Sequence, residues 1–502
     1  MPGTRQIPPF AKILPWVIAG ILAGNWLPGT PWYYPAIGTA ACCVCGWVWR
    51  QKDIAWIYAG AAVLLFAMSV TLSTATREVM PHGQKLVMAL RIDSRVEENG
   101  NWLKADATVD KFRAAGEPGT AWQKSGEKVV IRFDTDRHIS VGERLIATGR
   151  AGSLGTEEYA GYVKLMERRG YSAAVWVGRA DSVIMLPGRS HTPGIIAARL
   201  QSRAKGRFDR LDLRADSGDI AKAMALGVRN GVSRELRDSY AAGGASHLLA
   251  VSGLHVGIVA VLINILLFCM PIVRHGHIIK NAVAITAIWS YAMVTGLSPS
   301  VLRSAMMFSG GQLALASSRR SASVNILLAT ATVMLLLNPG YLFDISFQMS
   351  FAAVAVIFMF FRPLYGLVRT RFKLLNILWG AFIIGMVSSL ATAPLASYYF
   401  GRISLIGPFI NPAVVLTAHI TILFSLLWVI APLGFMNGLF SAVINFSAGL
   451  QNGIVAFSAS KNWAYLDLDL SKWQVATVYI AIFAAWHFLV IRRKRNTKPE
   501  LE

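Results

Sequence analysis

Long apolar runs recur along most of this sequence, and a chain with that pattern folds as a set of membrane helices. A helix needs about 20 apolar residues to cross the hydrocarbon core of a bilayer. The chain is 54% hydrophobic and only 15% charged, whereas soluble proteins carry about 25% charged residues. Lipid is therefore the expected solvent for most of it. The runs lie at 11–28, 33–49, 54–73, 247–271, 282–296, 300–317, 324–338, 345–361, 376–398, 405–431, 437–458 and 474–491.

Basic residues gather in alternate intervals between these runs. Clusters begin at Arg50, Arg274, Arg319, Arg369 and Arg492, while the other intervals carry few Lys or Arg. Cytoplasmic loops of membrane proteins are enriched in Lys and Arg. This pattern predicts about twelve spans in a cytoplasmic (inner) membrane, with both termini in the cytoplasm. It also explains most of the net charge of +22 without a nucleic-acid partner.

The stretch from about 85 to 185 has a different character. Apolar residues alternate with polar ones at 105–110, 128–134 and 143–149, as in half-buried strands. We predict a small β-barrel of about 100 residues outside the cytoplasm, inserted after the third span. At 195–214, apolar residues follow a helical period among many Arg residues. That pattern is typical of a helix on a lipid surface, and binding of DNA phosphate is the alternative.

These patterns divide the chain into five segments. The fold class is a polytopic α-helical membrane protein with an inserted β-barrel. The segments are the N-terminal anchor helices 1–75, the β-domain 76–190, amphipathic linker helices 191–243, a membrane channel domain 244–492 and a basic cytoplasmic tail 493–502.

One apolar run contains three polar residues, His247, Ser252 and His255. The two histidines are eight residues apart, which places them on one face of a continuous helix. Ser252 with a histidine is compatible with a hydrolase pair, but no acid accompanies it, and a metal site needs more ligands. Two interpretations remain. Gly253-x-x-x-Gly257 indicates a helix–helix packing seam, and the polar side chains indicate the lining of a pore.

Two further polar clusters occur at the edges of apolar runs. A lone arginine at the centre of a membrane helix costs about 2.5–3.5 kcal/mol, so Arg303 either reaches the interface or lines an aqueous path. Asp344 either caps the helix that follows it or faces the same path, and Gln348 lies four residues on, on the same face.

These clusters resemble the sequence blocks of ComEC-type competence proteins, a family of DNA internalisation channels. The first block is Leu226–Leu236 followed by His247–Val256. The next blocks are Tyr291–Arg303, Asn338–Phe351, and Ala391–Leu405 with Asn411-Pro412. The resemblance implies a channel that passes single-stranded DNA across the membrane during natural transformation. It also implies that the external β-domain resembles an oligonucleotide-binding (OB) barrel.

The resemblance places candidate residues in both regions. In the β-domain, aromatic and basic side chains would stack bases and bind phosphate. Barrel core is the alternative for the aromatic residues, which include Trp122 and Phe133. The β-domain candidates are Trp102, Lys104, Lys111, Phe112 and Arg113. The candidates for the DNA path are His247, Ser252, Gly253, His255, Ser298, Ser300, Arg303, Asp344, Gln348, Ser350 and Asn411.

Two motifs that would make the chain an enzyme are missing from the sequence. It contains neither the H-x-H-x-D-H string of the metallo-β-lactamase-like domain that many family members carry, nor a Walker A loop. We therefore expect no catalytic residues, metal or cofactor. The expected partners are DNA, lipid, a separate cytoplasmic ATPase motor and a periplasmic DNA-binding protein. A separate nuclease and a homo-oligomer are also compatible with the sequence. The alternatives are a transporter or flippase for another anionic substrate, and a membrane-embedded hydrolase using Ser252 and His255.

The alternation of basic clusters generates a topology test. We predict that residues 74–244 lie outside the cytoplasm, because cytoplasmic loops carry the Lys and Arg excess. Reporter fusions after Gly119 and at the C-terminus should report opposite sides of the membrane. A cytoplasmic signal from the Gly119 fusion contradicts the topology.

Overall fold

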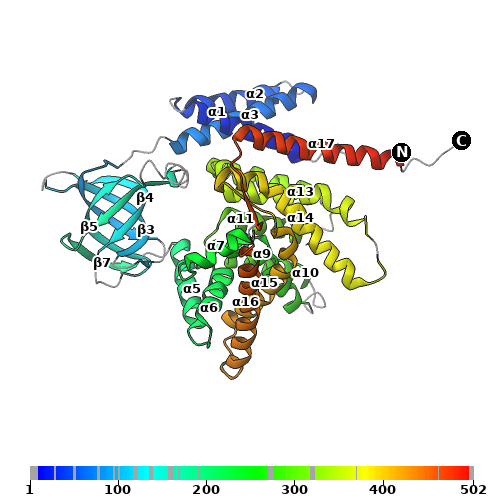
Figure 1. The fold of residues 1–502 in the computed structure, drawn as a ribbon. Helices are drawn as coiled ribbons and strands as arrows, with labels where there is room; N and C mark the ends of the chain where they lie inside the picture. Colours follow the sequence, from blue (N-terminus) through cyan, green and yellow to red (C-terminus); the bar gives the residue numbers. More distant parts are fainter. Residues whose placement is uncertain are drawn as a thin grey trace. The chain divides into compact units, whose positions relative to one another are not determined.

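A computed structural model of the chain contains a β-domain and many helices (Figure 1). Arg50, Arg274, Arg319 and Arg369, four of the basic residues on which the expected topology depends, lie outside the residues that it describes. The described residues are 9–27, 30–48, 52–75, 80–93, 96–99, 102–116, 121–134, 139–155, 163, 166–167, 170–189, 192–268, 276–316, 323–368, 370–461 and 463–496.

The chain forms two compact units. The first unit consists of Met1–Ala204, Trp289–Leu297 and Ser318–Asp344. The second consists of Lys205–Ile288, Ser298–Ser317 and Ile345–Glu502.

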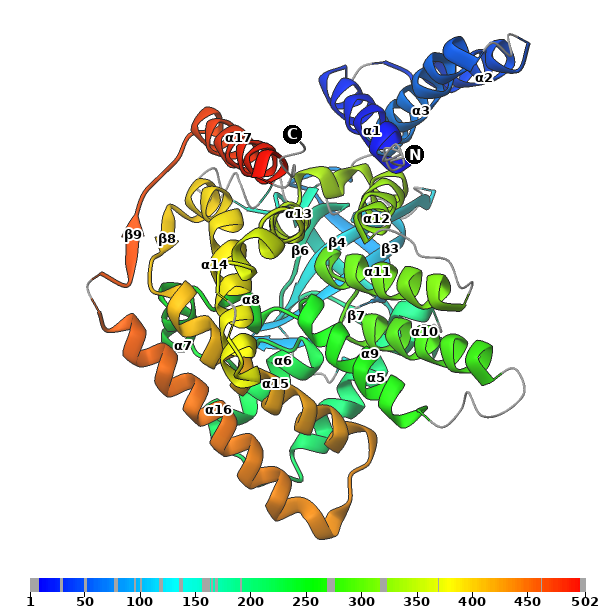
Figure 2. The same ribbon diagram turned by 90° about the vertical axis from the view of Figure 1, so that its right-hand side faces the viewer.

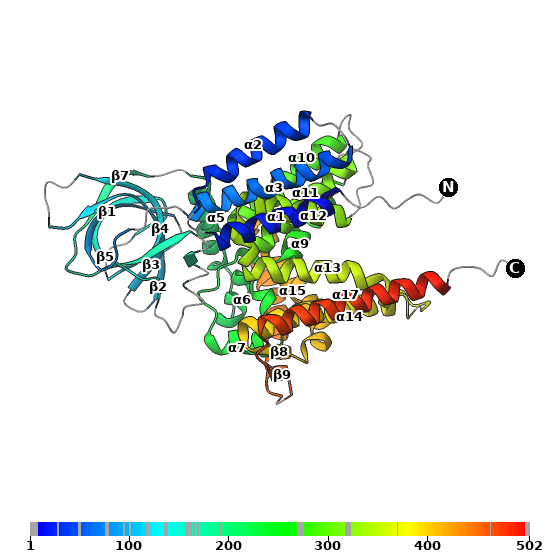
Figure 3. The same ribbon diagram turned by 90° about the horizontal axis from the view of Figure 1, so that it is seen from above.

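The β-domain of the first unit is a closed barrel (Figure 3). Its strands pair in the order β1-β3-β4-β6-β5, and β5 pairs again with β1 to complete the ring. All these pairs are antiparallel except β4–β6, which is parallel. β2 adds to β3, and β7 adds to β5. The strands are β1 (Lys85–Ile92), β2 (Glu97–Asn99), β3 (Trp102–Ala114), β4 (Gln123–Phe133), β5 (Glu143–Gly152), β6 (Tyr171–Val177) and β7 (Val183–Arg189).

Period-two alternation fills the barrel interior. In β1, Leu86, Met88, Leu90 and Ile92 point inward and are buried. Successive side chains of a strand face opposite sides, so the residues between them face outward. Small residues of β3 and large residues of β4, such as Phe133, complete the same core. The strands predicted at 105–110, 128–134 and 143–149 lie within β3, β4 and β5, apart from Asp134.

The helices of the first unit pack in a small cluster. α3 packs against α1 and α2, and α1 packs against α12. α12 leads into a short 3-10 helix, η3. The elements are α1 (Pro9–Trp26), α2 (Tyr33–Val48), α3 (Lys52–Ala75), α12 (Ser323–Leu337) and η3 (Pro339–Phe343).

The second unit is built from apolar helices, among which α15 and α16 pack against each other. Both pack against α6, α14 packs against α13 and α15, and α9 packs against α11 (Figure 2). The elements are α6 (Ala215–Leu226), α7 (Arg234–Ala242), α8 (Ser246–Leu249), α9 (Gly253–Leu266), α11 (Pro299–Ala316), α13 (Ile345–Tyr365), α14 (Lys373–Phe400), β8 (Arg402–Ser404), α15 (Gly407–Ile430), η4 (Gly434–Met436), α16 (Asn437–Ala459), β9 (Tyr465–Asp467) and α17 (Lys472–Asn496). Two further helices, α5 (Pro193–Phe208) and α10 (Gly276–Val294), have residues in both units.

Each predicted apolar run overlaps a helix, and the chain contains membrane-spanning candidates. Among the described residues, four helical segments are long and apolar enough to cross a bilayer, at 345–365, 373–400, 407–430 and 434–459. Shorter apolar helices lie at 10–26, 59–72, 253–266 and 323–337. The basic helix predicted at 195–214 ends earlier, because α5 stops at Phe208.

The second unit also contains a very close approach of two distant segments. Gly244 has a φ of +68°, a conformation open to glycine, and a Cβ there would lie 2.7 Å from Ser404 Oγ. The Ser404 hydroxyl donates to the Ala242 carbonyl oxygen at 3.0 Å, 162 residues away in sequence. The turn before α8 is thus held against the end of β8.

The barrel core generates a stability test. Phe133 is 0% exposed, and removal of a buried phenylalanine side chain typically costs about 3–5 kcal/mol. We predict a loss of that size for Phe133→Ala, measured by pulse proteolysis of the β-domain in the full chain. Trp122→Ala is the matched control, because Trp122 is 38% exposed and should cost far less. Equal losses in the two variants contradict the assignment of Phe133 to the core.

Candidate functional site

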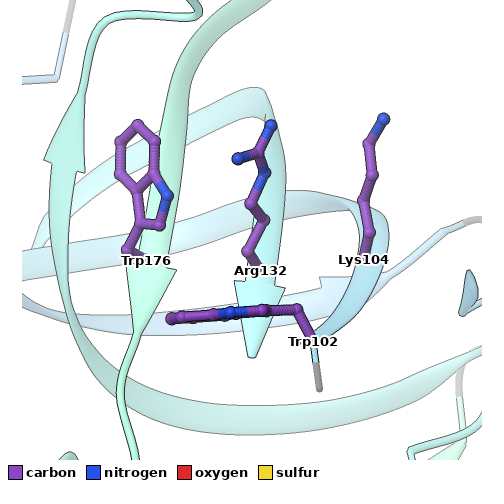
Figure 4. A pocket seen from close by; sticks show the side chains of 4 residues that line it. All are labelled: Trp102, Lys104, Arg132 and Trp176. Carbon is purple, nitrogen blue, oxygen red and sulfur yellow. The ribbon is translucent and has the colours of Figure 1, made fainter. Parts of the chain in front are cut away.

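A pocket on the outer face of the barrel is lined by two indoles and two cations. Its volume is about 350 Å³, and its lining residues are Trp102, Lys104, Arg132 and Trp176. Figure 4 shows Lys104 and Arg132 side by side, pointing the same way, with the Trp102 indole edge-on and the Trp176 indole face-on. The two ring planes are therefore steeply inclined and form a corner rather than a parallel sandwich.

Strand register explains why these side chains meet. Lys104 of β3 lies opposite Arg132 of β4, and Arg132 lies opposite Trp176 of β6. Their neighbours Ala105, Ile131 and Val175 face the barrel core, so the pocket residues must face outward. Like charges directly opposite each other destabilise a sheet. The Lys104–Arg132 pair is therefore unfavourable by itself, and Glu97 of β2 lies in register with Lys104 on the other side of β3.

The electrostatics of the pocket favour a ligand that is both aromatic and anionic. The Arg132 guanidinium carbon lies 5.8 Å from the centre of the Trp176 ring, within the range of a cation–π contact. Among the described residues, no carboxylate forms an ion pair with Lys104 or Arg132. Exposed indoles stack on bases and cations bind phosphate, which is the combination found in single-strand binding sites.

The structure brings together only two of the five β-domain candidates. Trp102 and Lys104 line the pocket. Lys111 is exposed and Phe112 packs against the barrel core. Arg113 lies over the ring of Trp122, 5.1 Å from its centre. A register shift between Val109 and Lys111 separates these three from the pocket end of β3.

Two pocket residues, Arg132 and Trp176, were not predicted from the sequence. Each stands in an alternating strand, where an outward-facing cation or indole is ordinary. Only the pairing of β4 with β3 and β6 places them beside Lys104. Alternation alone identifies their outward direction but not their neighbours.

In the second unit, the predicted continuous helix at 247–271 is wrong. α8 ends at Leu249, Ala250 and Ser252 are extended, and α9 begins at Gly253. His247 and His255 therefore lie on different helices and do not share one helical face. His247 is exposed on α8, whereas His255 is 0% exposed.

Ser252 and His255 form a reciprocal capping box at the start of α9. The Ser252 backbone N–H donates to His255 Nδ1 at 3.0 Å, and Ser252 Oγ lies 3.0 Å from the same nitrogen. The distance meets the requirement of a nucleophile–base pair. However, capping accounts for the backbone contact, because a helix start leaves backbone donors that need acceptors, and it also brings the two side chains together.

The two glycines of α9 form a packing seam with α11. A Cβ at Gly253 would lie 2.6 Å from Ser304 Oγ and 2.8 Å from an Arg303 nitrogen. A Cβ at Gly257 would lie 3.3 Å from the Phe308 ring. Glycines at i and i+4 thus meet α11 residues at the same spacing, as small residues do where membrane helices approach closely.

Arg303 is buried among neutral groups. Its side chain is 7% exposed, and its terminal nitrogens donate to the Ser350 carbonyl oxygen at 2.8 Å and to Ser304 Oγ at 3.2 Å. The guanidinium carbon lies 5.9 Å from the centre of the Phe351 ring. Among the described residues, Nε has no hydrogen-bond acceptor, and no carboxylate forms an ion pair with Arg303.

The remaining path candidates lie near different helices. Ser298 and Ser300 stand at the start of α11, and the Ser300 carbonyl accepts from Ser304. Gln348 Oε1 accepts from the Tyr399 hydroxyl at 2.9 Å, which joins α13 to α14. Asn411 is buried in α15. Asp344, 4% exposed, belongs to the first unit and follows η3. Ser252, Gly253, His255, Arg303 and Ser350 therefore gather in one region of the second unit.

Comparison with known proteins gives one family and two relatives. The family described as "Competence protein" matches residues 224–494, which is more than half of the chain. "ComE operon protein 3" of Bacillus subtilis (strain 168) is 33% identical over 193 residues, 38% of this chain and 24% of that protein. An "Uncharacterized protein" of Aquifex aeolicus (strain VF5) is 26% identical over 278 residues, 55% of this chain and 57% of that protein. The matches thus span less than two thirds of either relative. No solved structure matches.

The capping box at Ser252 generates a test that separates a structural serine from a reactive one. We predict that Ser252→Ala lowers the stability of the purified chain by about 1 kcal/mol, whereas Ser252→Asn retains it, because asparagine is also a good N-cap. Thermal unfolding in detergent measures both. Equal destabilisation by Asn and Ala would show that the hydroxyl does more than cap α9.

Proposed function

Because the chain belongs to the Competence protein family, we propose that it passes single-stranded DNA across the cytoplasmic membrane during DNA uptake. The observation that carries this proposal is the buried Arg303 at the meeting of α9, α11 and α13. Its partners among the described residues are all neutral, so its positive charge remains available to an anion.

The chemistry around Arg303 suits a polymer that must keep moving. A buried charge is costly unless another charge or a polar path compensates it. A site that conducts must bind strongly enough to admit its substrate and weakly enough to release it. A single guanidinium held by a carbonyl and a hydroxyl satisfies both needs better than a dense ring of cations would.

The β-domain supports the same proposal. A five-stranded ring closed in the order β1-β3-β4-β6-β5, with β4 and β6 parallel, is consistent with an OB-like barrel, a fold that often binds oligonucleotides. In the proposed arrangement, this domain lies outside the cytoplasm, about twelve helices cross the membrane, and both termini are cytoplasmic.

The proposal assigns other steps to other proteins. The chain itself would act as a channel and not as an enzyme, with a separate ATPase motor, a periplasmic DNA-binding protein and a separate nuclease as partners. A transporter or flippase for another anionic substrate would share the Arg303 chemistry. Such a protein would not need the aromatic pocket of the barrel, because only nucleic acid offers bases for stacking.

The buried guanidinium generates the central prediction. Arg303→Ala should lower transformation frequency about 10- to 150-fold, because a hydrogen bond to a charged group is worth about 1.5–3 kcal/mol. Protein abundance and arrival of DNA outside the cytoplasm should be unchanged. Transformation assays with labelled donor DNA separate arrival from entry.

Arg303→Lys is the matched control for charge alone. Lysine keeps the charge but lacks the planar fork that binds two groups at once, so transformation should remain low. Near-normal transformation with lysine would show that Arg303 only anchors a helix end. Normal DNA uptake in a clean deletion of the whole gene would contradict the proposed function itself.

A further inference from the structure

A row of cations extends from the pocket around the outside of the barrel. Lys104 on β3 pairs with Arg132 on β4, Arg132 pairs with Trp176 on β6, and Trp176 pairs with Arg150 on β5. Neighbouring strands lie about 4.8 Å apart, so the four residues cover about 14 Å of surface perpendicular to the strands. Three of the four carry a positive charge. We call Lys104, Arg132, Trp176 and Arg150 the cationic row.

The adjacent row differs sharply. Two residues further along each strand, the outward positions are Asp106, Val130, Ala174 and Gly152, which lie in register with one another. That row contains no cation. The cationic row is therefore bordered on this side by a row without cations, although other cations, such as the cross-strand pair Lys111–Lys124, lie elsewhere on the barrel.

The cationic row ends at β5 because the next position is neutralised. Lys85 of β1 lies opposite Arg150, but its ammonium binds the Asp181 carboxylate at 2.6 Å. Burial acts to raise the pKa of Asp181, but the hydrogen bonds from Lys85 and the Gly178 backbone, together with the charges of Lys85 and Arg150, outweigh it, so the pKa lies below its usual value. Asp181 is thus ionised at neutral pH and holds Lys85. The charge of Arg150 also acts on Asp181, but among the described residues no ion pair at contact distance joins the two.

Gly152 determines the orientation of the Trp176 ring. A Cβ at Gly152 would lie 2.9 Å from Cζ3 of Trp176 and 3.6 Å from Cη2. The Trp176 ring therefore lies over the β5 backbone at a position where only glycine leaves room. It forms a flat platform between Arg132 and Arg150.

We propose that single-stranded DNA lies across the barrel along the cationic row, from β3 over β4 and β6 to β5. Lys104, Arg132 and Arg150 bind successive phosphates, and a base between them stacks on Trp176, with Trp102 as a second platform in the pocket. This inference deepens the proposed function and rests on it for the identity of the polymer. It assigns Arg150 and Gly152, which lie outside the pocket, to DNA binding.

Phosphate chemistry alone would also fit a lipid headgroup or polyphosphate. The indole of Trp176 favours DNA over both, because neither a lipid headgroup nor polyphosphate offers a base to stack. Base–aromatic stacking is sequence-tolerant, which suits a protein that takes up DNA of any sequence.

The experiment uses the full chain in phosphatidylcholine nanodiscs and a fluorescein-labelled 15-nucleotide oligo-dT. Fluorescence anisotropy over a series of salt concentrations gives affinity and its salt dependence. Each phosphate contact with a single strand contributes about −0.7 to the slope of log K against log salt. Arg150→Ala should therefore make the slope shallower by about 0.7. Trp176→Ala should weaken binding about 5- to 150-fold without changing the slope.

Two variants make the test specific. Gly152→Ala removes no charge but displaces the Trp176 ring, so it should weaken binding at an unchanged slope. Arg144→Ala removes an exposed cation from the same strand, six residues from Arg150 and away from the row. It should leave affinity and slope unchanged.

The outcomes separate the inference from the proposed function. If the full chain binds oligo-dT and all four variants bind equally well, the row is overturned while the Arg303 channel remains. If Arg144→Ala behaves like Arg150→Ala, or if polyphosphate displaces the oligonucleotide equally well before and after Trp176→Ala, the surface is merely basic and the inference also fails. If uptake is normal in the gene deletion, the proposed function fails whatever the anisotropy shows.

Discussion

A polar group placed among apolar helices must find its partner within the protein, because lipid supplies no hydrogen bonds. The second unit is organised around this constraint. At the start of α9, Ser252 and His255 satisfy each other's backbone. In the helix pair α15–α16, the hydroxyls of Thr421 and Ser447 lie 2.8 Å apart. Arg303 finds a carbonyl, a hydroxyl and an aromatic face, which satisfy its hydrogen bonds in part but leave its charge uncompensated.

The barrel differs from the second unit, because its outer face bears charge. Its interior is closed by alternating Leu, Met, Ile, Val and Ala side chains, so stability does not depend on the outward positions. The outward positions can therefore hold like charges opposite each other without loss of the fold. Three cations and two indoles gather on one side, where repulsion between Lys104 and Arg132 is tolerated because the core offsets it. Such a local conflict between stability and side-chain choice is typical of binding surfaces.

Periodicity and apolar length were sufficient to locate most helices and strands, since both patterns follow directly from burial. They did not reveal the break at Ala250–Ser252, because an apolar run looks the same whether its helix is continuous or restarts at a serine cap. They also identified Trp102 and Lys104 but not Arg132 or Trp176. Cross-strand neighbours depend on register, and β4–β6 is a parallel pair between strands that are not consecutive in sequence. Lys111 and Arg113 lie away from the pocket, beyond the register shift in β3.

The close fit of Gly244 against Ser404 has a consequence for biosynthesis. The turn before α8 is completed by a hydroxyl that the ribosome adds 162 residues after Ala242. At about 5–20 residues per second, that interval is about 8–30 s. During it, α9, α10, α11, α12, α13 and α14 are synthesised while the segment with His247 and Ser252 lacks the contact with Ser404. The turn before α8 can therefore take its final form only after β8 has been synthesised.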